Sequence, residues 1–173
     1  MAIENPRSVL NQMGDDYRIV SRPIDRPQLV ERPFGLFHDG WIAMGGGEGL
    51  ARKRDFDIMD FWPIVEHLML LEWLSNGDFL YRVVGGHIVQ AIGFDATGKR
   101  LSELGHRIDA ASLNAGFTDV VRDASPKYEV ISGRAFLRDW QAYERMLVPL
   151  ADEAGDARFI LGCVEATGYL PTL

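Results

Sequence analysis

The strongest pattern in the chain is a pair of apolar segments separated by a tight-turn sequence. Leu68 to Leu74 is almost continuously apolar, and Phe79 to Val84 follows it after Ser75-Asn76-Gly77-Asp78. Asn and Gly tolerate the positive φ angles that two-residue hairpin turns require. The pattern therefore predicts an antiparallel β-hairpin.

Short helical segments follow this hairpin. His87 to Ile92 predicts a short helix that Gly93 ends, and Thr97 to Leu104 predicts another short helix or turn. Ile108 to Asp123 is the longest helical candidate, because four of its apolar residues recur at the spacing of one helix face. These residues are Leu113, Phe117, Val120 and Val121.

Three further apolar segments complete the pattern and predict strands. They run from Tyr128 to Leu137, from Tyr143 to Leu150 and from Arg158 to Thr167. Consecutive strands usually pair, and helices must cover a sheet to bury its apolar face. The order therefore predicts an α+β fold, with a five-stranded antiparallel sheet and with the short helices and one longer helix on one face.

The N-terminal region carries weaker signals. Ser8 to Met13 could form one or two helical turns, and the proline spacing after Ser21 favours extended chain. We interpret residues 1 to 35 as an arm. Trp41 to Met44 could be a strand, and Gly45 to Gly49 should be a flexible connection. The expected division is residues 1–51 for the arm and the Gly-rich connection, 52–168 for the domain and 169–173 for a C-terminal tail.

Composition and charge narrow the class of protein. The net charge of −7 argues against a nucleic-acid partner or an anionic membrane surface. The single cysteine, Cys163, excludes an intramolecular disulfide and fits a reducing cytoplasm. Residues 1–30 hold no apolar run long enough for a signal peptide, and no later segment is long enough to span a membrane. We therefore expect a cytoplasmic protein with no nucleic-acid or membrane partner.

The order of the predicted elements resembles that of PAS domains. The similarity is closest to a family of small bacterial proteins built from a single PAS domain, and it runs from Arg52 to Thr167. Three phrases carry it: RDFDIMDFWPIVEHLMLLEW, FLYRVVGGHIVQAIGFDATGKRLSEL and YERMLVPLADEAGDARFILGCVE. The resemblance implies a sensory or regulatory module, and it implies no defined catalytic residue or ligand.

No cofactor or metal is expected. The four histidines lack the spacing of a helical metal-binding pair and have no cysteine neighbour. By the resemblance, a haem-binding PAS domain would carry a histidine on or beside the long helix; Ile108 to Asp123 contains none, and His106 only precedes it. A light-sensing flavin domain would carry an Asn-Cys-Arg phrase between its short helices, which this sequence lacks.

Polar side chains interrupt two of the predicted strands, where Arg82 follows Tyr81 and Arg145 lies two residues after Tyr143. Two interpretations stay open. The arginines could take solvent positions or pair with Glu72 and Glu144 across the sheet. If they point inward, a small anionic ligand would be their natural partner. The candidate ligand-binding residues are Tyr81, Arg82, His87, Leu113, Phe117, Tyr143, Arg145 and Cys163.

The last two predicted strands are apolar on both faces. Met146, Val148 and Leu150 alternate with Leu147, whereas a sheet with one wet face should alternate apolar and polar residues. Something should therefore cover the outer face: the N-terminal arm, a second copy of the chain or a partner protein. We expect a homodimer that buries these strand positions, with the arm contributing.

Together these patterns predict a sensory or regulatory module that binds a small molecule or a signalling partner and has no catalytic output of its own. One alternative is a small enzyme that uses the same cavity, with Tyr81, His87 and Tyr143 as acid–base groups. Another is an interaction module with a collapsed cavity. The fold alone does not separate the three.

Overall fold

The computed structural model describes residues 18–22, 24, 33–105, 108–132 and 141–168, and a seven-stranded sheet forms its centre. Six strands follow the order β1-β5-β6-β7-β3-β4, in which all neighbours are antiparallel, and β2 pairs with β6 in parallel off this path. The strands are β1 (Arg18–Arg22), β2 (Ala51–Arg52), β3 (Leu68–Trp73), β4 (Phe79–Val84), β5 (Lys127–Ser132), β6 (Gln141–Ala151) and β7 (Ala157–Gly168).

The predicted hairpin forms between β3 and β4. Trp73 pairs with Phe79, and Gly77 in the turn has a φ of +84°, a conformation that glycine adopts without strain. The buried carboxyl group of Asp78 accepts hydrogen bonds from the backbone N of Phe79 (2.8 Å) and from the hydroxyl of Ser102 (2.6 Å). The hairpin turn is thereby tied to the 3-10 helix η4 (Leu101–Leu104).

The predicted α+β fold with five antiparallel strands is confirmed, because β3 to β7 correspond to the five predicted segments. The sheet also gains β1 at its β5 edge and the short β2 beside β6, which the sequence pattern did not predict. The stretch 133–137 of the third predicted strand lies outside the described residues.

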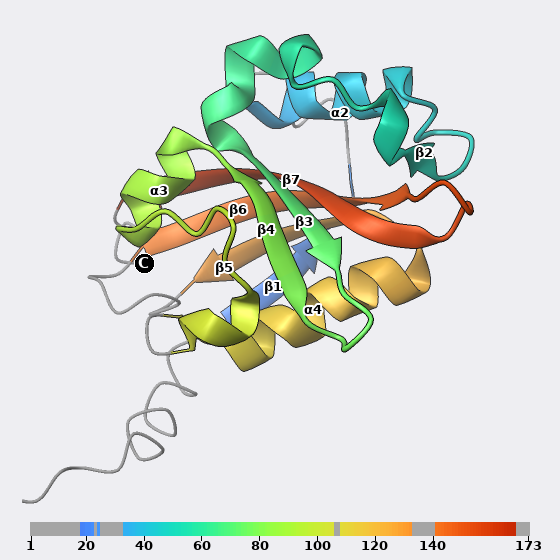
Figure 1. Ribbon diagram of the computed structural model, residues 1–173. Coiled ribbons are helices and arrows are strands. Elements are labelled where there is room, and N and C mark those ends of the chain that lie inside the picture. The colour runs from blue at the N-terminus through green and yellow to red at the C-terminus, as the bar shows by residue number, and fades with distance from the viewer. Residues whose placement is uncertain (1–17, 23, 25–32, 106–107, 133–140, 169–173) are drawn as a thin grey trace, which may run out of the picture.

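Three helices cover one face of the sheet, and they correspond to the predicted helical segments (Figure 1). α3 (Gly86–Ile92) ends at Gly93, which is left-handed. α4 (Ala110–Asp123) begins after Asp109, whose carboxyl oxygen accepts a hydrogen bond from Ser112 N at 3.1 Å. The predicted stripe of Leu113, Phe117, Val120 and Val121 is buried against the sheet together with η4 and α3.

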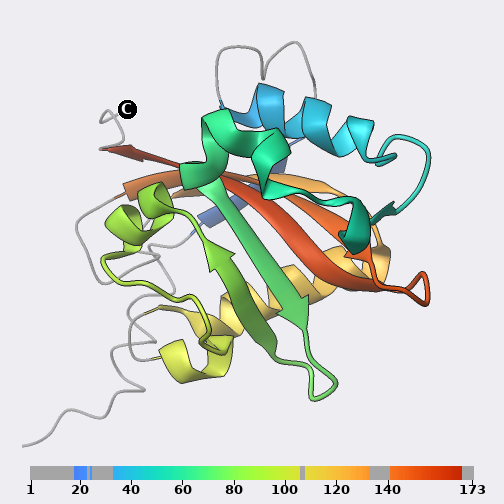
Figure 2. The same cartoon turned by 45° about the horizontal axis from the view of Figure 1, so that its top comes forward.

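A second helical layer covers the opposite face (Figure 2). It consists of α2 (Pro33–Ala43) and the 3-10 helices η2 (Lys53–Asp55) and η3 (Ile58–His67). Buried Phe34, Phe37, Trp41 and Phe61 from this layer pack against the outward-facing apolar residues of the sheet. The turn at the start of η3 is capped by Asp57, whose carboxyl oxygen accepts a hydrogen bond from Met59 N at 2.9 Å.

The prediction of a strand over Trp41 to Met44 is wrong, because α2 continues to Ala43 and a turn follows it. Pro33 at the first helical position fits the start of a helix. The buried aromatic residues of α2 recur at spacings of three and four and so lie on one face of the helix: Phe34, Phe37 and Trp41. The four residues Trp41 to Met44 are too few to show this helical period.

The apolar outer positions of β6 and β7 are thus covered within the chain. Met146, Val148 and Leu150 on β6 share their core with α2 and η3, and so does Leu161 on β7. No second chain is needed to bury these strand positions, so their apolar pattern is not a reason to expect a homodimer. Among the described helices, none is long and apolar enough to cross a membrane.

Candidate functional site

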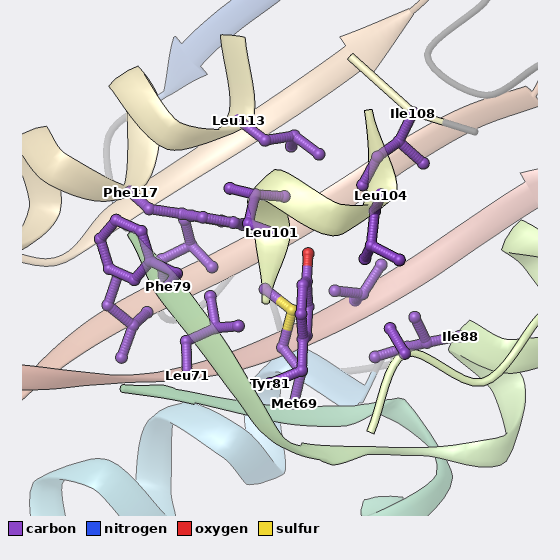
Figure 3. Packing of buried hydrophobic residues seen from close by; sticks show 14 of the residues in the cluster. Met69, Leu71, Phe79, Tyr81, Ile88, Leu101, Leu104, Ile108, Leu113 and Phe117 are labelled. Carbon is purple, nitrogen blue, oxygen red and sulfur yellow. The ribbon is translucent and has the colours of Figure 1, made fainter. Parts of the chain in front are cut away.

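A cavity lies between the sheet and the helices α3 and α4. Its volume is about 60 Å³. Most of its wall is apolar, and Figure 3 shows several of these side chains from close by. The apolar wall includes Met69, Ile88, Leu104, Ile108, Leu113 and Phe117.

Arg145 is the most unusual residue of this wall. It lies on β6 and is only 4% exposed. Its Nε donates a hydrogen bond to Oε2 of Glu129 at 2.7 Å, and its Cζ lies 5.2 Å from the centroid of the Phe117 ring. Its Nη2 is buried and has no hydrogen-bond partner among the described residues. A buried donor without an acceptor is rare in folded proteins and often marks a functional position.

Two tyrosines add polar atoms to the apolar wall. Tyr81 on β4 and Tyr143 on β6 are both buried and both line the cavity. In Figure 3 the phenol oxygen of Tyr81 points toward Leu101 and Leu104. Burial raises the pKa of Tyr81 to about 12, and the positive charge of Arg145 opposes this shift only in part. Tyr81 is therefore a neutral hydroxyl at physiological pH.

The structure brings five of the eight predicted ligand-binding residues together in this wall. They are Tyr81, Leu113, Phe117, Tyr143 and Arg145. The inward interpretation of the arginines thus holds for Arg145, although it pairs with Glu129 and not with the Glu144 that the sequence suggested.

The other three predicted residues lie elsewhere. Arg82 is exposed, and its guanidinium binds the carboxylate of Glu72 on β3, with 2.8 Å between Nε and Oε2. Cys163 is buried in the second core, beneath α2 and η3, so it belongs to the opposite face of the sheet. The outward interpretation therefore holds for Arg82, and Cys163 does not line the cavity.

His87 lies beside the cavity wall and makes a structural contact. Its Nε2 accepts a hydrogen bond from the backbone N of Ala166 on β7 at 3.1 Å. Its ring lies 4.4 Å from that of His67, whose Nδ1 is 3.0 Å from the carbonyl oxygen of Val164. Desolvation lowers the pKa of His87, and the neighbouring His67 lowers it further. The two histidines join η3 and α3 to the end of β7.

Two carboxyl groups of the site were not predicted from the sequence. Glu129 faces Arg145 in register across β5 and β6, and Asp109 lines the cavity at the start of α4. Glu129 lies in an alternating Tyr128-Glu129-Val130 pattern, where a glutamate normally faces solvent. Its pairing with Arg145 could have been proposed only from the register of the two strands.

A metal site would need several ligating side chains close together. Within the described part of the chain, no group of three or more His, Cys, Asp or Glu residues is placed to hold a metal ion. His106 lies outside the described residues.

The strand order β5-β6-β7-β3-β4, with short helices and one longer helix over a cavity on one face, defines a PAS-type α+β fold. The PAS domain family matches residues 31–165, and the chain belongs to this family of sensory and signalling modules.

Among solved structures, the chain is similar to a sensory box histidine kinase/response regulator from Burkholderia thailandensis E264. The sequence identity is 15%, the match covers 59% of this chain and 78% of that chain, and the TM-score is 0.37. No curated protein matches the chain.

Proposed function

We propose that this chain is a sensory or regulatory module that binds a small molecule in the cavity between α4 and the sheet. Binding would shift the packing of the sheet against its covering helices, and the signal would pass to a partner protein or a second copy of the chain. The chain itself would carry out no chemistry.

The observation that supports this proposal most directly is the state of Arg145. A charged side chain lies almost fully buried in a cavity wall, with one nitrogen left without a partner among the described residues. Leaving a buried donor unsatisfied costs roughly 1–3 kcal/mol, and a bound acceptor would recover that free energy. A purely structural arginine would be expected to have all its donors paired.

The geometry favours binding over the enzyme alternative. That alternative requires Tyr81, His87 and Tyr143 to act together on one substrate. His87 is not part of the cavity wall, and its Nε2 already accepts a backbone hydrogen bond. The pKa of about 12 for Tyr81 is far from neutral pH, where a general acid or base works best.

Native mass spectrometry of the purified full chain tests the proposal. We expect a mass excess that disappears under denaturing conditions, because a molecule retained from the expression host leaves the cavity when the chain unfolds. The third alternative, a collapsed cavity, predicts no such excess.

A cavity-filling variant and a matched control locate the binding. Ala91→Leu adds bulk to the cavity wall and should abolish the mass excess. Ala51→Leu adds the same bulk to the core on the opposite face and should preserve it. Circular dichroism shows whether both variants fold. No retained molecule, or equal retention in the two folded variants, would count against this cavity as the ligand site.

A further inference from the structure

We propose, on the basis of the proposed function, that the ligand of this cavity is a small neutral molecule with a carbonyl oxygen and a short aliphatic body. Its anchor would be the unpartnered Nη2 of Arg145. The argument rests on the charges around Arg145, on the free donor and on the apolar wall.

The charge of Arg145 is already compensated within the protein. Its Nε donates to Oε2 of Glu129 at 2.7 Å, and both side chains are buried. A second carboxyl group, that of Asp109, lines the same cavity. Among the described residues of the wall Arg145 is the only basic one, so this part of the site offers no excess positive charge to an anion.

The Nη2 of Arg145 is a hydrogen-bond donor that has no acceptor among the described residues. The ring of Phe117 lies over the guanidinium, and a methyl group added at Gly116 would come within 3.4 Å of Nη2. α4 therefore closes one side of this nitrogen, and no described residue accepts its hydrogen bond. A ligand oxygen that reaches Nη2 would satisfy it.

The compensated charge of Arg145 and its unpartnered Nη2 together favour a neutral hydrogen-bond acceptor over an anion. Moving a carboxylate from water into a site of low dielectric costs more than one hydrogen bond returns, unless an unpaired positive charge compensates it. A carbonyl group has a much smaller desolvation cost and still gains a charge-assisted hydrogen bond from the guanidinium. An inward arginine alone would suggest an anionic ligand, which requires an unpaired positive charge. Arg145 is already paired with the carboxylate of Glu129, so it offers no such charge.

The rest of the ligand would meet hydrocarbon. Apolar side chains make up most of the wall, among them Ile88, Leu113 and Val164, and the cavity of about 60 Å³ suits a small molecule. A short aliphatic ketone, aldehyde, ester or amide has this size and this distribution of polarity.

Three isosteric probes test the inference on the full chain: 2-pentanone, butyrate and 2-methylpentane. They share a propyl group and the same number of non-hydrogen atoms, and they differ only in whether the other end is a ketone, a carboxylate or a branched hydrocarbon. Their dissociation constants are measured at pH 7.5 by titration followed by NMR. We expect the ketone to bind roughly tenfold to a hundredfold more tightly than either of the others, as one hydrogen bond to a charged donor implies.

Variants identify the anchor. Arg145→Met leaves Glu129 buried and unpaired and could fail to fold, so Glu129→Gln is combined with it to remove both charges. This double variant should bind the ketone no more tightly than the hydrocarbon. Arg82→Met is the matched control, because Arg82 is also a strand arginine paired with a glutamate but lies away from the cavity. It should keep the wild-type preference for the ketone.

Equal or tighter binding of butyrate would overturn the inference of a neutral ligand. Equal binding of 2-methylpentane, or an unchanged ketone preference in the double variant, would overturn the role of Arg145 as the anchor. In each case the cavity still binds a small molecule, so the proposed function stands. Failure of all three probes also overturns the inference, and the retained molecule in the native mass experiment then decides the proposed function separately.

Discussion

At the scale of single residues, burial shifts the pKa of Tyr81 more strongly than the positive charge of Arg145 does. Desolvation raises its pKa to about 12, whereas an unfolded chain should show the ordinary value near 10. A pKa that is raised on folding means that the stabilisation is present below about pH 10 and is lost as the pH rises toward 12.

We therefore expect wild type to lose roughly 2–3 kcal/mol of unfolding free energy between about pH 10 and pH 12, relative to Tyr81→Phe. The measurement is urea unfolding of both proteins across this range, so that other groups that titrate at high pH cancel in the difference. Parallel pH profiles would show that Tyr81 ionises as readily in the folded protein as in the unfolded chain.

Phe117 has a double role at the same scale. It is 1% exposed, it packs edge-to-face on Phe79 at 5.5 Å, and its ring faces the guanidinium of Arg145 in the cavity wall. We expect Phe117→Ala to lower the free energy of unfolding by roughly 3–5 kcal/mol and to weaken ligand retention.

Chemical denaturation measures the stability change, and native mass spectrometry measures retention. Asp119→Ala, on the exposed side of α4, is the control and should change stability by at most about 1 kcal/mol. A loss below about 0.5 kcal/mol in Phe117→Ala would contradict the packing around this ring.

The two arginines show what a sequence can reveal about single residues. Arg82 and Arg145 both interrupt apolar strands, and local pattern does not distinguish them. Their difference comes from the sheet: Arg82 pairs with Glu72 on an exposed surface, whereas Arg145 faces α4 and pairs with Glu129 on β5. The candidate tyrosines and the α4 stripe were predictable, but the buried ion pair depended on strand register.

At the scale of elements, the pair His67 and His87 joins the two helical layers to the end of β7. Nε2 of His87 accepts the backbone N–H of Ala166, so this nitrogen must be unprotonated for the contact to exist. Burial and the adjacent His67 lower the pKa of His87, and the carboxylates of Glu66 and Glu165 oppose that shift. A pKa that is lowered on folding means that the stabilisation is present above about 6.5 and is lost as the pH falls.

We expect wild type to lose stability between pH 7.5 and pH 5, and His87→Gln to lose less. Glutamine removes the titrating ring and keeps an oxygen that can accept the N–H of Ala166, so the variant should stay close to wild type at pH 7.5. Unfolding free energies at the two pH values measure the effect. Equal losses in the two proteins would mean that His87 does not couple protonation to folding.

Elements differed in how far the sequence determined them. The β3–β4 hairpin and α4 were predictable because each has a strong local signal, a tight-turn dipeptide in one and a helical stripe in the other. α2 was missed because its apolar period begins at Phe34, inside a segment that its prolines marked as extended. Its close approach to η3 also depends on Gly40, where a methyl group would come within 2.4 Å of Phe61.

At the scale of the whole molecule, the described chain is a sheet between two helical layers (Figure 1). The exposed side chains of the two layers differ. All the large exposed hydrophobic residues in the described part of the chain belong to α2 and η3: Leu36, Ile42, Met59 and Trp62. The most exposed are Trp62 at 64% and Met59 at 61%. Concentration of exposed apolar residues on one face is typical of a contact surface.

We therefore expect the homodimer interface on α2 and η3, and not on the strands. The outer positions of β6 and β7 are already buried by α2 and η3, so a second copy would meet the far side of those helices. We expect the full chain to be dimeric at high micromolar concentration by size exclusion with light scattering. Trp62→Lys combined with Met59→Lys should shift it toward monomer, because two charges would have to be desolvated in the interface.

Thermal unfolding separates the loss of this contact from a general loss of stability. Both substituted residues are exposed, so the double variant should lose only the thermal stability that association with a second copy contributes. Arg122→Glu on the opposite layer changes charge to a similar degree and should leave the dimer intact. A wild-type chain that is monomeric at high concentration would contradict the homodimer.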